Sequence, residues 1–141
     1  MIKVFLVNSV VVALVVLIHY EFVHRFSLYI PKMHLRHRLR ILIGVFGALF
    51  AHSIEIWIFA VVYYFMHNSK DWGSLTGNFD GSFFDCAYFS FTAFTTLGFG
   101  DIVPLGEVRF LVGIESLTGL VLITWTASFL FLEMQKFWST D

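Results

Sequence analysis

Hydrophobic and polar residues occupy separate long blocks of this chain. Apolar runs cover Ile2 to about Tyr20, Ile41 to Met66, and Val108 to Leu132. Each run is long enough to cross a bilayer, which takes roughly 20 helical residues. Polar and charged residues gather between the runs, at 21–40 and 67–82. The pattern therefore predicts three transmembrane helices joined by hydrophilic segments.

A fourth apolar segment, FFDCAYFSFTAF at 83–94, is too short to cross. It reaches about 13 residues if its helix continues to Thr95, which is too few to span at a rise of 1.5 Å per residue. It begins with Ser82-x-x-Asp85, the spacing of a capping box, although such a pair also arises by chance. We expect a short helix that enters the membrane and returns on the same side.

Composition supports this all-α membrane fold, with three transmembrane helices and a re-entrant helix between the second and third. The chain is 58% hydrophobic and 13% charged, whereas soluble domains carry about a quarter charged residues. We expect residues 1–40 to form an N-terminal helix and a basic linker, and 41–141 a second unit with a short tail. The first run lacks a small-x-small cleavage site and is interpreted as a retained helix. The single cysteine, Cys86, cannot form an intrachain disulfide.

Positive charge predicts the topology. Of the 9 Lys and Arg residues, those between the first two apolar runs are Arg25, Lys32, Arg36, Arg38 and Arg40. The positive-inside rule places this linker in the cytoplasm of a cell-membrane protein, with the N-terminus outside and the C-terminus inside. The same charges could also hold anionic lipid headgroups. Setting the topology is the simpler interpretation.

The re-entrant helix leads into TTLGFGD, residues 95–101. Non-helical backbone at membrane depth persists only where it is buried in protein or lines water. Gly98 and Gly100 allow backbone conformations that turn successive carbonyls to one side. A ladder of oxygens able to bind a dehydrated metal cation would then come from Thr96, Leu97, Gly98 and Phe99. One chain supplies one wall of such a ladder, so several copies are needed.

These residues resemble the signature filter of the potassium channels, T-x-G-Y/F-G-D, and residues 41–133 are similar to the pore unit of that family. Pro104, Arg109 and Gly119 also fit the family pattern. The resemblance implies a selectivity filter at Thr96, Leu97, Gly98, Phe99 and Gly100. It further implies a homotetramer that conducts potassium passively, catalyses no reaction, and needs neither a cofactor beyond the permeant ion nor a nucleic-acid partner.

The residues around the filter depart from the family pattern. Leu97 replaces a Val or Ile and Phe99 a Tyr. The helix residues that would support the filter are also unusual. Tyr88 and Phe89 stand where the family often has a tryptophan pair, and Thr92 replaces a glutamate found in some members. The expected supporting residues are Tyr88, Phe89, Thr92, Thr95 and Asp101. Because Phe99 has no hydroxyl, we expect packing alone to hold the filter.

Residues at every fourth position mark one face of the last helix, namely Gly119, Ile123, Ala127 and Phe131. Such a stripe can line a cavity or pack against a neighbour. By the family resemblance it would line the pore, with Gly119 as a hinge and Phe131 as a constriction at the cytoplasmic mouth.

Ionisable residues deep in the apolar runs form a second candidate site. His52 and Glu55 share a helix face, and Glu115 lies at an overlapping depth, so we expect one polar cluster near Thr92 and Thr95. Its role is either structural, as a neutral hydrogen-bonded group, or a protonation switch that makes conduction depend on pH.

Charge elsewhere narrows the function. No run carries arginine at every third position, so there is no voltage-sensor helix. The region expected outside is mainly acidic and would concentrate cations. Its charged residues are Asp71, Asp80, Asp85, Asp101 and Glu107, with Lys70 and Arg109.

Two alternative functions are open. An accessory subunit could share the pore fold without conducting. A membrane haem or metal protein could use histidine ligands. The candidate ligands are His19, His24, His52 and His67.

Overall fold

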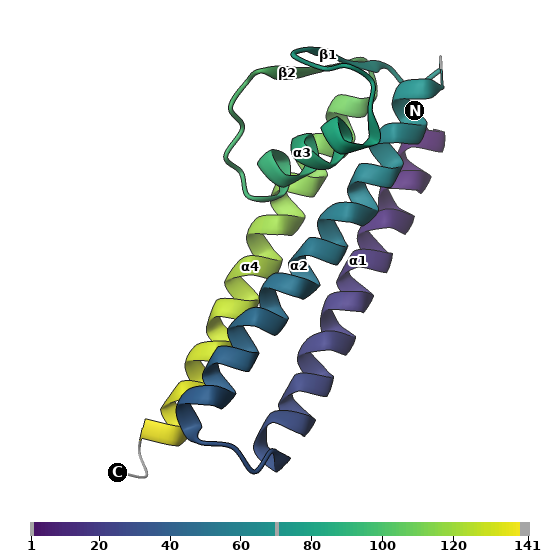
Figure 1. Ribbon diagram of the computed structural model, residues 1–141. Coiled ribbons are helices and arrows are strands. Elements are labelled where there is room, and N and C mark those ends of the chain that lie inside the picture. The colour runs from purple at the N-terminus through teal and green to yellow at the C-terminus, as the bar shows by residue number, and fades with distance from the viewer. Residues whose placement is uncertain (1, 70, 139–141) are drawn as a thin grey trace.

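The computed structural model describes residues 2–69 and 71–138. Its long helices are α1 (Ile2–Tyr29), α2 (His37–Asn68) and α4 (Val108–Trp138), which lie side by side in Figure 1. All 3 are long and apolar enough to cross a membrane, which confirms the prediction of an all-α membrane fold. The N-terminal end of α1 and the C-terminal end of α4 lie at opposite ends of this bundle (Figure 1).

The helices extend beyond the apolar runs that predicted them. α1 continues to Tyr29, a short 3₁₀ turn follows at Ile30–Lys32, and α2 already begins at His37. The basic segment is therefore mostly helical, and only a short connection joins the two helices. Charged residues can continue a helix because they pair one turn apart, as Arg25 Nε does with Glu21 Oε1 at 2.6 Å. Hydropathy alone marks the membrane-embedded part and misses these extensions.

One stripe of α1 packs against both α2 and α4. The buried residues of this stripe are Val4, Asn8, Val11, Val15 and His19. Their spacing of three and four residues keeps them on one helix face. Large apolar side chains on the rest of α1, such as Phe5 and Leu17, are exposed, as expected for a helix that faces lipid.

The short helix α3 (Phe83–Phe94) packs between α2 and α4 near one end of the bundle. Its first turn is capped by Ser82, whose Oγ accepts the Asp85 N–H at 3.1 Å, so the predicted cap is present. The Asp85 carboxylate does not return the bond to Ser82 and accepts the Asp80 N–H at 2.8 Å instead. The core around α3 includes Phe59 and Phe94, which are both fully buried.

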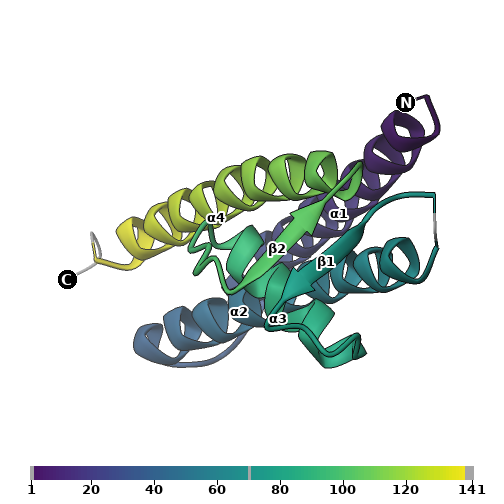
Figure 2. The same ribbon diagram turned by 90° about the horizontal axis from the view of Figure 1, so that it is seen from above.

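A small antiparallel sheet, which the sequence did not predict, covers α3. It pairs β1 (Ser74–Gly77) with β2 (Ile102–Leu105), and Gly77 lies opposite Ile102. Figure 2 shows both strands crossing above α3. Because β2 starts directly after Asp101, the sheet fixes the point where TTLGFGD ends. The Asn78 N–H also bonds to the Asp101 carbonyl at 2.8 Å.

Candidate functional site

The TTLGFGD segment has an alternating backbone. Thr96, Gly98 and Gly100 have φ angles of 59°, 51° and 79°, while the residues between them keep ordinary negative φ. Alternation of left-handed and right-handed conformations turns successive carbonyl groups to the same side of the chain. Glycine adopts positive φ without steric cost, but threonine rarely does. Thr96 therefore holds a conformation that the surrounding structure must impose.

One side of the TTLGFGD segment is exposed, and no other described part of the chain covers it. Residues 95–100 are all exposed, with Leu97 and Phe99 at 60% and 65%. Apart from the directly adjoining residues, no described atom lies within 4 Å of the position that a Cβ atom would take at Gly98 or Gly100. This side of the segment is therefore left uncovered by the described residues of its own chain.

Hydrogen bonds attach the back of the segment to α3. The Gly98 N–H donates to the Thr92 carbonyl at 3.1 Å, and the Thr96 N–H donates to the Ala93 carbonyl at 3.0 Å. The Tyr88 hydroxyl donates to Asp101 Oδ2 at 2.9 Å. The expectation that packing alone holds the segment is therefore wrong. Tyr88 supplies a hydroxyl where the sequence comparison noted only a missing tryptophan.

The other predicted supporting residues act in different ways. Phe89 is buried and its ring meets that of Tyr63 edge-on, with centroids 5.1 Å apart. The hydroxyls of Thr92 and Thr95 bond to carbonyls of their own helix, so Thr92 supports the segment through its backbone. A pocket of about 270 Å³ lies between α3, the segment and α4, and Thr92, Gly98 and Ser116 are among its lining residues.

Comparison of the sequence with known protein families gives a match. Residues 51–136 match the family described as "Ion channel", and this match covers more than half of the chain. The chain belongs to this ion-channel family. No significant match was found among curated proteins or among solved structures. Family membership agrees with the membrane fold and indicates a protein that transports ions.

The predicted stripe on α4 of the channel is not uniform. Ile123, Ala127 and Phe131 are exposed, and Phe131 is 52% accessible. Gly119 is buried instead, because α4 passes directly against the end of α3 there. A methyl group at Gly119 would overlap the Phe94 carbonyl. The expectation that Gly119 lies on the open face is therefore wrong, and its glycine is explained by close packing.

The predicted polar cluster of the channel is two separate groups. Among the described residues, no hydrogen bond links Glu115 to His52 or Glu55. Glu115 is fully buried and bonds to the Tyr63 and Ser90 hydroxyls, which joins α4 to α2 and α3. Position along a helix does not specify which face of that helix meets which neighbour.

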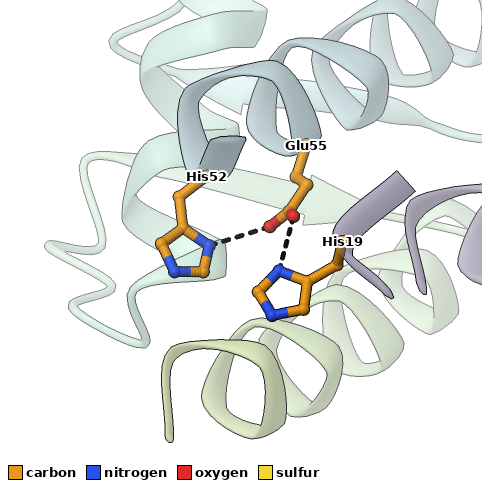
Figure 3. A group of neighbouring side chains, drawn as sticks. All are labelled: His19, His52 and Glu55. Atoms are coloured by element: carbon orange, nitrogen blue, oxygen red, sulfur yellow. Dashed lines mark hydrogen bonds and ion pairs between the residues drawn. The ribbon is translucent and has the colours of Figure 1, made fainter. Parts of the chain in front are cut away.

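The second group contains a residue that the sequence analysis did not place there. Figure 3 shows the imidazoles of His19 and His52 on either side of the Glu55 carboxylate. The distances are 2.8 Å from His19 Nδ1 to Glu55 Oε1 and 2.8 Å from His52 Nδ1 to Glu55 Oε2. His19 continues the buried stripe of α1, four residues after Val15. Apolar residues surround this helix, so the sequence did not indicate which face would be buried.

The other two candidate histidine ligands lie elsewhere. His67 Nδ1 accepts the Leu75 N–H at 3.1 Å, and His24 is exposed and stacks on Tyr20. The structure therefore brings together only His19 and His52 of the four histidines considered.

Acidic residues near the TTLGFGD segment accept hydrogen bonds from neighbouring residues. Asp80 Oδ1 accepts the Ser82 N–H at 2.7 Å, and the Ser82 hydroxyl and N–H both lower the pKa of Asp80. Asp85 and Asp101 accept the bonds described above. Lys70, which the charge count included, lies outside the described residues. These carboxylates order the loop around α3 in addition to any effect on cations.

Proposed function

We propose that this chain forms a homotetrameric, potassium-selective channel that conducts passively. The main support is the exposed wall at residues 95–100, because a membrane protein cannot leave that much non-helical backbone facing lipid. Copies of the chain around an axis would complete the site and also cover Leu97 and Phe99. Membership of the ion-channel family and the filter-like sequence both favour this arrangement.

Potassium would bind to the carbonyl oxygens of Thr96, Leu97, Gly98 and Phe99. Carbonyl rings replace the hydration shell of a dehydrated cation, and several weak sites in a row allow ions to leave as well as enter. The alternating φ angles support this assignment because they turn neighbouring carbonyls to one side. The C-terminal end of α3 precedes the filter, so its helix dipole would favour a cation there.

The proposed orientation places the β1–β2 sheet outside the cell and the α1–α2 connection in the cytoplasm. It rests on the basic residues near that connection. Ile123, Ala127 and Phe131 would face the inner cavity, and the basic residues could contact anionic lipid headgroups.

The decisive experiment compares potassium and sodium flux into liposomes that contain only this protein. We expect potassium to pass at least tenfold faster. Gly98→Ala should abolish flux or selectivity, because alanine disfavours the left-handed conformation by about 1 kcal/mol and the cost recurs in each subunit.

Gly81→Ala is the matched control. Gly81 has a φ of 85° and nothing within 4 Å of its side-chain position, so the backbone strain is similar but lies in the loop before α3. Gly81→Ala should retain flux and selectivity. Equal sodium and potassium flux in the wild type would refute potassium selectivity. A tetramer without any flux would favour the accessory subunit.

A further inference from the structure

Beyond the proposed function, a buried group of metal-ligand side chains lies away from the filter. Glu55 and His19 are fully buried, and the side chain of His52 is 14% exposed. Their ligand atoms all lie within 4.8 Å of one another. They come from two transmembrane helices, since His19 belongs to α1 and the other two to α2 (Figure 3).

We propose that His19, His52 and Glu55 bind one divalent transition-metal ion of the zinc class. This ion would join α1 to α2. Two imidazoles and one carboxylate form a ligand set found in zinc and iron sites. Residues three apart on one helix, with a ligand from a facing helix, are also how helical bundles build metal sites in their cores.

The geometry needs only small adjustments to hold the ion. Zinc–nitrogen bonds of about 2.1 Å place tetrahedral ligand atoms about 3.4 Å apart. The two present hydrogen-bond distances of 2.8 Å would lengthen by about 0.6 Å as the ion replaced the shared protons. Water would take the fourth position. The imidazole rings of His19 and His52 stack with centroids 5.4 Å apart. Their ligand atoms, which lie within 4.8 Å of one another, would have to approach by up to about 1.4 Å through side-chain rotation.

A neighbouring residue is placed to orient one ligand. Thr126 on α4 lies 3.3 Å from His19 Nε2 through its Oγ1. When Nδ1 binds a metal, the imidazole proton resides on Nε2 and can be donated to this hydroxyl oxygen. Such outer hydrogen bonds fix the tautomer and direction of a metal-binding histidine. Thr126 would therefore be a positioning residue for the site.

A bound cation would balance the charge of the Glu55 carboxylate, and a pocket near the site provides a route for the ion to enter. A carboxylate without solvent contact between transmembrane helices needs a positive partner or a proton, and a divalent ion meets that need. A pocket of about 220 Å³ opens between α1 and α4, and Trp125 lines it. The Trp125 ring also contacts His19, with centroids 5.2 Å apart. The ion could reach the site beside this side chain.

The first test measures metal content and thermal unfolding of the purified full-length protein. After removal of metals with a chelator, the wild type should take up one zinc ion per chain and unfold at a higher temperature. His19→Gln and Glu55→Gln should lose both effects. Thr126→Val should weaken zinc binding tenfold to a hundredfold. His24→Gln, which changes an exposed histidine five residues further along α1, should behave as the wild type.

A second measurement does not depend on variants that fold. Cobalt(II) added to the metal-free wild type should give visible absorption bands typical of low-coordinate nitrogen and oxygen ligation, which equimolar zinc should remove. No zinc uptake by the wild type, or equal loss of zinc from the His19→Gln and His24→Gln variants, would overturn the proposal. Metal content is independent of conduction, so a failure here leaves the channel function untouched, and a non-conducting protein can still bind zinc.

Discussion

Replacing Gly119 by alanine tests whether this glycine serves close packing or hinge motion. A methyl group there would overlap the carbonyl oxygen, the carbonyl carbon and the first ring atom of Phe94. Two of these atoms belong to the backbone, so a rotamer change cannot relieve the overlap. Either α3 or α4 must move, and overpacking of this kind costs about 1 to 3 kcal/mol.

Gly113→Ala is the matched control because both glycines lie within α4. Nothing lies within 4 Å of the side-chain position at Gly113. Both substitutions gain up to about 1 kcal/mol of helix propensity, which cancels when the variants are compared. The difference of about 1 to 3 kcal/mol should lower the unfolding temperature of Gly119→Ala by roughly 4 to 12 °C relative to Gly113→Ala, at about 4 °C per kcal/mol for a chain of this size.

Thermal unfolding in detergent measures this difference, and flux assays on the same samples test its consequence. Phe94 is the last residue of α3, so its displacement should also disturb the filter and reduce flux. Equal unfolding temperatures for the two variants would refute the packing argument. If Gly119→Ala then altered only the open probability, the hinge role implied by the family resemblance would be supported.

Further predictions concern hydrogen bonds around α3. Tyr88→Phe removes the bond to Asp101. External potassium would stabilise the proposed filter by mass action, so we expect the current of this variant to decay faster than that of the wild type when external potassium is low. Unchanged decay would contradict the role of this bond. Glu115→Gln should stay within about 1 kcal/mol of the wild-type stability, because the amide oxygen can accept from one hydroxyl and the amide NH2 can donate to the other. Glu115→Leu should unfold at a distinctly lower temperature. Similar losses in both variants would indicate that the charge of Glu115 is required. The pKa of Asp80 is lowered by its bonds from the Ser82 hydroxyl and N–H. Its stabilising effect is therefore present at neutral pH and is lost in acid, as the pH falls through this lowered pKa. Hydrogen exchange at the Ser82 amide should therefore show an additional loss of protection in acid that Asp80→Asn abolishes, and equal acid sensitivity of the two proteins would exclude Asp80 as the cause.

Local patterns in the sequence predicted those parts of the fold that depend on neighbouring residues. The three long helices follow from apolar length, and the start of α3 follows from the side chains of Ser82 and Asp85. The alternating backbone at Gly98 and Gly100 follows from what glycine permits. The β1–β2 sheet was missed because its strands are four residues each and lie far apart in the sequence. Their pairing depends on the position of α3 between them.

The faces that helices present to one another were predicted less well. Gly119 and Glu115 both lie on α4, and the sequence gives their separation and depth but not which neighbour each one meets. The position of His19 depends in addition on how α1 docks, since hydropathy provides only a broad apolar surface around that helix. The Tyr88 bond to Asp101 was missed for a different reason. A family comparison counts replaced residues, whereas a tyrosine hydroxyl can fill the role of an absent indole N–H.

The contacts of Phe94 connect α1 with the TTLGFGD segment, although the two lie far apart in the sequence. The ring of Phe94 is 5.8 Å from that of His52, while its carbonyl faces Gly119 and its chain continues directly into Thr95 and the filter. His52 in turn bonds to Glu55, which bonds to His19 of α1. A shift of α1 would therefore displace packed side chains of α2 and α3, and through Phe94 it could move the TTLGFGD segment. Such coupling needs an element with two arrangements. α2 and α4 contact the end of α3 directly, through His52 and Gly119. α1 is connected to it through the hydrogen bonds of Glu55.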